Sequence, residues 1–295
     1  MSILLTGCFD AGERDEWLTL LRAALPDETL VLEADADVDI AIVANPPRGA
    51  LQGLPKLALI QSLWAGVDKL LADDSIPPQV PIARMVDPAM NEAMAETALW
   101  AVLSLQRDFF DYARQQAAMQ WRPHPQRRAD ELPVLVLGRG QMGAAVARRL
   151  AVNGFPVTAW GSRDGPLAPH LAAAAVVINL LPLTPATRGI VDAAALAAMR
   201  PGASLVNLAR GAHVVDDALL AALDAGHLRH AVLDVFHQEP LPSEHRFWSH
   251  PRVTLLPHVA AATDARSAAA VAAANVKRLR AGAPLAQLVD RARGY

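Results

Sequence analysis

The feature that most restricts the fold of this chain is a glycine-rich turn, Gly138-Arg139-Gly140-Gln141-Met142-Gly143. The turn follows a strand-like apolar run at residues 134–137 and leads into a helix-like stretch that reaches residue 150. A GxGxxG sequence between a strand and a helix is typical of dinucleotide-binding units. In that interpretation Gly138 makes the tight turn, Gly140 lets the backbone approach a pyrophosphate, and Gly143 allows close helix packing. The plainer alternative is a glycine turn without a ligand.

Short apolar runs alternate with amphipathic stretches along most of the chain. In the N-terminal third, strand-like runs and one helix-like stretch lie at residues 3–5, 13–25, 30–32, 40–43 and 57–61. From 133 to about 260 the strand candidates are residues 134–137, 157–160, 176–180, 204–208, 231–235 and 253–256, most of them separated by helical segments. This order predicts parallel sheets with right-handed crossovers, and therefore an α/β fold in two doubly wound domains.

Two longer helical candidates and one irregular segment complete the pattern. Residues 91–119 are apolar on more than one side, which predicts a helix buried on two faces. Residues 121–132 are polar and contain two prolines, which indicates a connection between domains. Residues 263–279 predict an alanine-rich helix.

The composition favours a small-molecule ligand. A formal net charge of −3, from 27 basic and 30 acidic residues without long blocks, argues against binding to nucleic acid or to an anionic membrane. The single cysteine, Cys8, excludes an intrachain disulfide framework and fits a reducing compartment. The N-terminus lacks the features of a secretory signal, and the longest apolar stretch, at 171–183, is too short to span a bilayer. We therefore expect a cytoplasmic location.

The end of the second strand in the glycine-rich unit bears on the choice of cofactor. A site that prefers NAD carries an acidic residue there, about 20 residues after the glycines, which binds the ribose hydroxyls. This chain has Ser162 and Arg163 instead, a hydroxyl and a guanidinium that suit a 2′-phosphate. The pattern favours NADPH. Alternatively, Arg163 is a solvated loop residue, and Asp164 neutralises it or serves as a displaced ribose ligand.

Three charged or titratable residues follow successive strand candidates: Arg210, Glu239 and His258. In a parallel sheet these positions share one edge with the glycine-rich turn, so the three side chains can converge on a nicotinamide. Arg210 can hold a carboxylate bidentately, and His258 can supply a proton near neutral pH. Glu239 would orient the imidazole and favour its protonated form. Each residue alone is more often structural, and only their joint placement favours a catalytic role.

Asp234 is a carboxylate inside an apolar strand and therefore needs a partner. The nicotinamide carboxamide or a structural hydrogen bond would serve equally well. The histidines lack metal-binding spacing, so we expect no metal site.

Three segments resemble the D-isomer-specific 2-hydroxyacid dehydrogenases: residues 207–211, NLARG; 233–242, LDVFHQEPLP; and 256–260, LPHVA. Residues 247–253 and 289–295 are also similar to the glyoxylate/hydroxypyruvate reductase A branch of that family. The resemblance spans nearly the whole chain. It implies a homodimer, with a Rossmann NAD(P)-binding domain (residues 96–274) inserted in a flavodoxin-like substrate domain (residues 1–95 and 275–295).

The resemblance also implies roles for individual residues. Arg210 binds the substrate carboxylate, His258 is the acid/base, and Glu239 is its partner. Trp64, Ala65 and Gly66 form a substrate loop, although Trp64 could be a core aromatic. The remaining ligand-binding assignments are Arg84 and Trp248 for the substrate, where a salt bridge is the alternative for Arg84, and Leu181, Pro182, Ala209 and Asp234 for the cofactor.

The expected function is reduction of a short 2-keto acid such as glyoxylate or hydroxypyruvate, with NADP(H) preferred and NAD(H) possible. Two alternatives stay open. One is a D-2-hydroxyacid dehydrogenase that acts on a bulkier keto acid or prefers NADH, and the other is a nucleotide-sensing binding protein without significant turnover. Arg139 stands where related reductases often carry a small or apolar residue, and it could assist phosphate binding or lie on the surface.

Overall fold

The computed structural model describes residues 1–295, which form two compact α/β units. Unit 1 comprises Met1–Ala89 and Thr263–Tyr295, and unit 2 comprises Met90–Ala262. Every strand pair in both sheets is parallel, which confirms the predicted fold class. No helix combines the length and the apolar character that crossing a bilayer requires.

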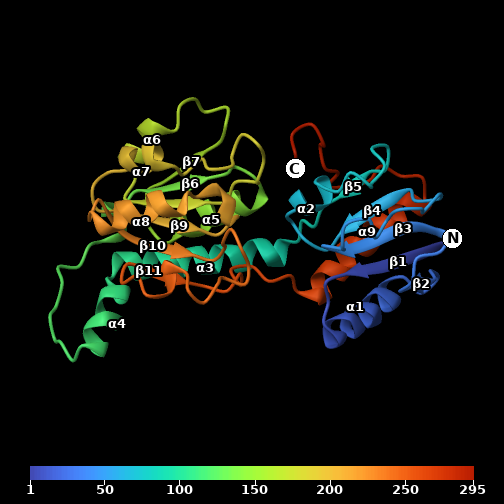
Figure 1. Cartoon of the computed structure of the whole chain (residues 1–295), viewed down its shortest axis with the longest axis horizontal. Coiled ribbons are helices and arrows are strands. Elements are labelled where there is room, and N and C mark those ends of the chain that lie inside the picture. The colour runs from blue at the N-terminus through green and yellow to red at the C-terminus, as the bar shows by residue number, and fades with distance from the viewer. The chain divides into compact units, whose positions relative to one another are not determined.

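Unit 1 contains a five-stranded sheet of order β2-β1-β3-β4-β5, the arrangement of flavodoxin-like folds (Figure 1). Its elements are β1 (Ser2–Gly7), α1 (Ala11–Ala24), β2 (Leu30–Val31), β3 (Val38–Ala44), β4 (Leu59–Ser62), α2 (Asp68–Leu71), β5 (Ile82–Ala83) and α9 (Ala265–Arg280). The strands β3 and β4 are buried throughout, as expected for central parallel strands that read as continuous apolar runs.

Unit 2 contains a six-stranded sheet of order β11-β10-β9-β8-β6-β7. Its strands are β6 (Val134–Leu137), β7 (Val157–Trp160), β8 (Val176–Asn179), β9 (Ala203–Asn207), β10 (Leu228–Leu233) and β11 (Val253–Leu255). Its helices are α3 (Pro88–Gln106, which begins in unit 1), α4 (Phe109–Ala117), α5 (Gln141–Val152), α6 (Ala168–Ala173), α7 (Ala193–Ala198) and α8 (Asp216–Asp224), with short 3₁₀ turns at Ala129–Glu131, Gly211–His213 and Arg246–Trp248.

Alternate residues of the unit 2 strands fill two separate apolar layers. Val134 and Val136 of β6 pack with residues of α3 and α5, whereas Leu135 and Leu137 pack with residues of α6, α7 and α8. Helices therefore cover both faces of the sheet, and the strand ends are left to carry polar groups.

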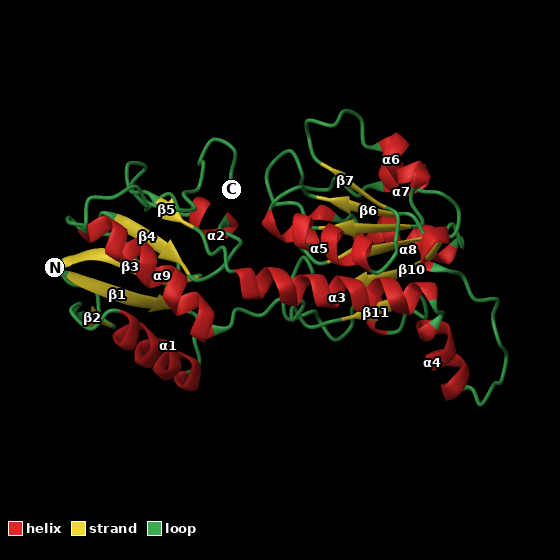
Figure 2. Cartoon of the chain, turned by 180° about the vertical axis from the view of Figure 1, so that it is seen from behind, coloured by secondary structure: helices red, strands yellow, loops and turns green.

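The prediction of one long helix at residues 91–119 is wrong in one respect, because the structure has two helices there, α3 and α4, with a break between them. Asp108 adopts a left-handed backbone conformation, with φ of +60°, at the break. Its carboxylate is bound by Arg229 of β10, so a contact across the fold overrides the helical pattern. Figure 2 shows α4 and the loop after it projecting from the sheet of unit 2.

The unit boundaries also differ from the predicted domain limits, which placed residues 90–95 in the substrate domain and 263–274 in the nucleotide-binding domain. The C-terminal helix α9 packs on α1 and β4, so it belongs to unit 1 from its first residue. In addition, Asn275 of α9 donates a buried hydrogen bond to Gln61 of β4 (2.7 Å). Sequence periodicity identified the helix but contained no sign of this partner.

Candidate active site

The glycine-rich turn has the geometry of a phosphate cradle. Gly138 has a φ of +113°, and a side chain there would lie 2.8 Å from the carbonyl oxygen of Leu180. A side chain at Gly143 would lie 1.9 Å from the carbonyl oxygen of Gly138. A side chain added at Gly140 would meet no other atom within 4 Å, so the approach to the N-terminus of α5 is open there. The residues present therefore fit a dinucleotide pyrophosphate.

The loop after β7 has an unexpected ion pair. Arg139 Nη1 contacts Asp164 Oδ1 (2.6 Å), and the other Asp164 oxygen accepts a hydrogen bond from the main-chain N–H of Gly161 (2.8 Å). This backbone hydrogen bond, followed by the Arg139 contact, lowers the pKa of Asp164. Asp164 thus pairs with Arg139 and not with Arg163, while Ser162 and Arg163 are exposed.

His258 and Glu239 meet at the carboxyl edge of the same sheet. His258 Nδ1 lies 2.7 Å from Glu239 Oε2, and both side chains are partly exposed. The other oxygen, Glu239 Oε1, accepts a hydrogen bond from the main-chain N–H of Phe236 (2.9 Å). Glu239 is therefore fixed at both oxygens, and His258 Nε2 is the ring nitrogen left for proton transfer.

Arg210 follows β9. At Gly211 the segment that carries Arg210 contacts the backbone of the segment that carries Glu239. A side chain at Gly211 would lie 1.9 Å from the carbonyl carbon of Phe236 and 2.4 Å from the nitrogen of His237. The Arg210 side chain also bonds its neighbour, since Nη1 donates to the carbonyl oxygen of Ala209 (2.8 Å). The two segments thus pack backbone to backbone, which fixes where Arg210 stands relative to Glu239.

Asp234 holds the backbone around His258. It is 1% exposed, and its two oxygens accept hydrogen bonds from the N–H groups of Val259 (2.8 Å) and Ala260 (3.1 Å). Its main-chain oxygen accepts from the N–H of His258, which has a φ of +55°. Burial raises the pKa of Asp234, and these hydrogen bonds oppose that shift. The structural partner expected for this carboxylate is present, and its cofactor contact stays a proposal.

Two buried asparagines shape the neighbouring loops and were missed by the sequence interpretation. Asn179 ends β8 and donates to Asn207 at the end of β9 (2.9 Å). Asn179 accepts from the N–H of Leu181 (3.2 Å), and Asn207 donates to the carbonyl oxygen of Arg210 (3.0 Å). The signal that could have found them is an amide at the last position of an apolar strand. Together they set the course of the segments that begin at Leu181, Pro182 and Ala209.

In unit 1 the predicted substrate loop follows β4. Ser62 Oγ accepts a hydrogen bond from the N–H of Trp64 (3.0 Å), and the carbonyl oxygen of Trp64 accepts from the N–H of Met85 (3.1 Å). The structure therefore places Arg84 beside the loop that contains Ala65 and Gly66. Trp248, in contrast, lies in unit 2, where its exposed indole donates to the carbonyl oxygen of Pro242 (2.9 Å).

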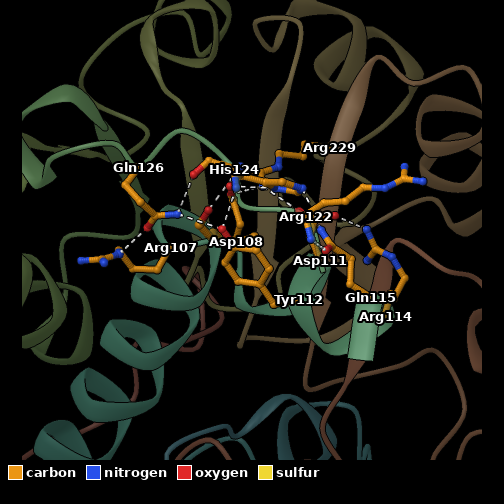
Figure 3. Close-up of polar contacts among 11 residues, drawn as sticks. Arg107, Asp108, Asp111, Tyr112, Arg114, Gln115, Arg122, His124, Gln126 and Arg229 are labelled. Carbon is orange, nitrogen blue, oxygen red and sulfur yellow. Dashed lines mark hydrogen bonds and ion pairs between the residues drawn. The ribbon is translucent and has the colours of Figure 1, made fainter. Parts of the chain in front are cut away.

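A separate polar cluster at the base of α4 has metal-ligand atoms within reach of one another, on Asp108, Asp111 and His124. Figure 3 shows Arg229 pointing between the two carboxylates, and its Nη2 lies 2.7 Å from Asp111 Oδ2. Arg114 pairs with Asp111 as well. The arginines supply the positive charge that a metal ion would bring, so this cluster is an ion-pair network that anchors α4.

The glycine cradle and the His258–Glu239 pair, at one edge of a parallel sheet, define the class of NAD(P)-dependent oxidoreductases. The family model "D-isomer specific 2-hydroxyacid dehydrogenase, NAD binding domain" matches residues 99–260. The chain therefore belongs to the D-isomer specific 2-hydroxyacid dehydrogenase family.

Solved structures of this family are similar over the whole chain. A D-isomer specific 2-hydroxyacid dehydrogenase of Xanthobacter autotrophicus Py2, solved with NADPH and MES, is 37% identical with a TM-score of 0.94, over 100% of this chain and 99% of that one. The NADPH-dependent glyoxylate/hydroxypyruvate reductase SmGhrA of Sinorhizobium meliloti, solved with NADP and sulfate, is 30% identical with a TM-score of 0.92, over 100% of both chains. A probable 2-hydroxyacid dehydrogenase of Rhizobium etli CFN 42, solved with NADP, HEPES and L(+)-tartaric acid, is 27% identical with a TM-score of 0.90, over 100% of this chain and 99% of that one.

Proposed function

We propose that the chain is an NADPH-preferring reductase of short 2-keto acids such as glyoxylate and hydroxypyruvate. The observation that carries this proposal is the 2.7 Å contact between His258 Nδ1 and Glu239 Oε2. It fixes the orientation of an accessible imidazole, as a proton donor to a keto oxygen requires. A bound nicotinamide supplies the hydride in this family of reactions.

Three residues of this chain would bind the substrate, transfer the proton and orient the proton donor. Arg210 binds the carboxylate next to the keto group, because a guanidinium matches a carboxylate in charge and shape. His258 gives its proton from Nε2 to the oxygen that becomes the hydroxyl group. Glu239 holds the imidazole ring in place through its contact with Nδ1.

The preference for NADPH rests on the loop after β7. Ser162 and Arg163 are exposed, and the nearest carboxylate, Asp164, is already paired with Arg139. This leaves a hydroxyl and a guanidinium for a 2′-phosphate, and no free carboxylate to bind ribose hydroxyls or repel the phosphate. The X. autotrophicus, S. meliloti and R. etli relatives were solved with NADPH or NADP, which supports the same choice.

The test is a stopped assay of NADPH and NADH oxidation against a panel of 2-keto acids. We expect turnover of glyoxylate and hydroxypyruvate, with NADPH preferred. His258→Ala should lower kcat by about 10²- to 10⁴-fold, the usual contribution of a general acid. His170→Ala, which changes a histidine of α6 in the same unit, is the matched control and should leave kcat unchanged.

Each result that contradicts these expectations would show that a different part of the proposal is wrong. Undiminished turnover in His258→Ala would remove His258 as the acid. Turnover confined to bulky keto acids, or a preference for NADH, would favour the other dehydrogenase assignment. Binding of NADPH without turnover of any keto acid would instead favour a nucleotide sensor.

We further propose that the enzyme is a cytoplasmic homodimer. The loop after α4 supports self-association, because Met119 and Trp121, which follow directly after this helix, are 94% and 97% exposed. Large apolar side chains exposed together mark interaction surfaces. Sedimentation equilibrium should give the mass of a dimer, and Trp121→Ser should weaken it. A monomer at micromolar concentration would contradict this part of the proposal.

A further inference from the structure

The turn after β7 in unit 2 is fixed by hydrogen bonds at both of its ends. The main-chain N–H of Asp164 donates to the carbonyl oxygen of Gly161 (2.9 Å), and the N–H of Gly161 donates to Asp164 Oδ2 (2.8 Å). One residue further out on each side, the indole Nε1 of Trp160 donates to the carbonyl oxygen of Gly165 (3.2 Å). The two residues in the middle of the turn are therefore held at its tip.

The side chain of Arg139 extends from the glycine-rich turn to the end of β7. The strands β6 and β7 are parallel neighbours, with Leu137 opposite Trp160, so the residues that follow them lie on the same edge of the sheet. A side chain at Gly161 would lie 3.4 Å from Arg139 Cδ and 3.6 Å from its Cγ. The stem of Arg139 therefore lies against the first position after β7, the region in which a site that prefers NAD carries its ribose-binding carboxylate.

The guanidinium of Arg139 is paired with Asp164 in a way that another anion can replace. The two groups are 2.6 Å apart, but the Arg139 side chain is 60% exposed and the Asp164 side chain is 26% exposed. An ion pair so accessible to water contributes little to stability. A phosphate monoester carries about 1.5 to 2 negative charges near pH 7, against one on a carboxylate. A 2′-phosphate that reaches this position therefore attracts Arg139 more strongly than Asp164 does.

We propose that Arg139 determines cofactor specificity by binding the 2′-phosphate of NADPH together with Ser162 and Arg163. This inference rests on the proposed function, in which NADPH is the preferred cofactor, and it adds a second guanidinium to the phosphate site. In the protein without nucleotide, Asp164 neutralises Arg139, and the 2′-phosphate takes its place when NADPH binds. NADH has a hydroxyl group at the same position and no charge to attract Arg139, so the pair with Asp164 persists when NADH binds.

The test measures the binding of 2′,5′-ADP and of 5′-AMP by calorimetry, because these two nucleotides differ only in the 2′-phosphate. The wild-type protein should bind 2′,5′-ADP more tightly. Arg139→Gln should weaken the binding of 2′,5′-ADP about 10-fold, as expected for the loss of one charge-assisted hydrogen bond, and should change that of 5′-AMP less than about 3-fold. Arg246→Gln is the matched control, because Arg246 is 63% exposed in the same unit and pairs with Asp224, and it should change neither affinity.

A double variant separates a direct contact from an indirect effect. If Arg139 acts only by neutralising Asp164, its removal has no effect once Asp164 is replaced by asparagine. Arg139→Gln/Asp164→Asn is therefore compared with Asp164→Asn alone. A direct contact predicts that the double variant binds 2′,5′-ADP about 10-fold more weakly than the single variant, while 5′-AMP binds equally to both. Equal affinities of the two variants for 2′,5′-ADP would overturn the inference.

The same measurements distinguish this inference from the proposed function. A wild-type preference for 2′,5′-ADP that is intact in Arg139→Gln would refute the role of Arg139 and leave the NADPH preference standing. A wild-type protein that binds both nucleotides equally would refute the NADPH preference and the inference with it. If Arg139→Gln abolishes a wild-type preference but no keto acid is reduced, the role of Arg139 is supported and the reductase assignment alone is refuted.

Discussion

Gly211→Ala should reduce turnover far more than it weakens nucleotide binding. The added methyl group would lie 1.9 Å from the carbonyl carbon of Phe236, about 1.5 Å short of an ordinary contact. Main-chain atoms cannot rotate away, so the Arg210 segment and the Glu239 segment must separate. A displacement of about 1 Å between groups that act together costs roughly 10²-fold in rate, and overpacking costs about 1–3 kcal/mol of stability. We therefore expect kcat/KM to fall at least about 100-fold.

The assay measures steady-state kinetics with glyoxylate or hydroxypyruvate, NADPH binding by fluorescence, and the free energy of unfolding in urea. Gly12→Ala in α1 is the control, because the nearest atom to its methyl group, an oxygen of Asp10, is 3.4 Å away. NADPH affinity should fall much less than kcat/KM in Gly211→Ala, since the phosphate cradle belongs to a different turn and only the proposed contact of Ala209 lies in the displaced segment. A folded Gly211→Ala enzyme with wild-type kcat/KM would refute the argument that this backbone contact sets the catalytic geometry.

Three other predictions concern unit 2. Arg163→Ala should raise the KM for NADPH far more than the KM for NADH, and an equal effect on both would contradict the 2′-phosphate assignment. Asp164→Asn removes a carboxylate paired with Arg139, so 2′,5′-ADP should bind more tightly by calorimetry; weaker binding would show that Asp164 is needed to position Arg139. Burial lowers the pKa of His230 from 6.5 to about 4, so the folded chain binds fewer protons than the unfolded chain between these values. The stabilising effect of neutral His230 is complete above pH 6.5 and is lost as the pH falls towards 4, by about 3 kcal/mol in total. Urea titrations should show a smaller loss in His230→Gln, and parallel pH curves for the two proteins would contradict the assignment.

The sheets were predictable because buried parallel strands read as short apolar runs. The runs at residues 134–137 and 157–160 coincide with β6 and β7, and the others differ from the observed strands by a few residues at one or both ends. The break between α3 and α4 was not predictable, because Arg229, which binds Asp108 there, is far away in sequence. The partner of Asp164 was missed for the same reason. The alternative interpretation of the sequence paired Asp164 with its neighbour Arg163, but folding brings Arg139 to Asp164 instead.

For the candidate site, too, the sequence indicates which residues to consider, but only the folded structure shows how they are positioned relative to one another. Arg210, Glu239 and His258 were identifiable because each follows a strand, and parallel strands end on one edge. Their exact relation depends on contacts between segments that no motif contains. Gly211 brings two loops into backbone contact, and Asp234 fixes the chain around His258. These residues touch no reacting atom in the proposed mechanism, so their substitution should reduce turnover by displacing the catalytic side chains and leave the chemistry those side chains perform unchanged.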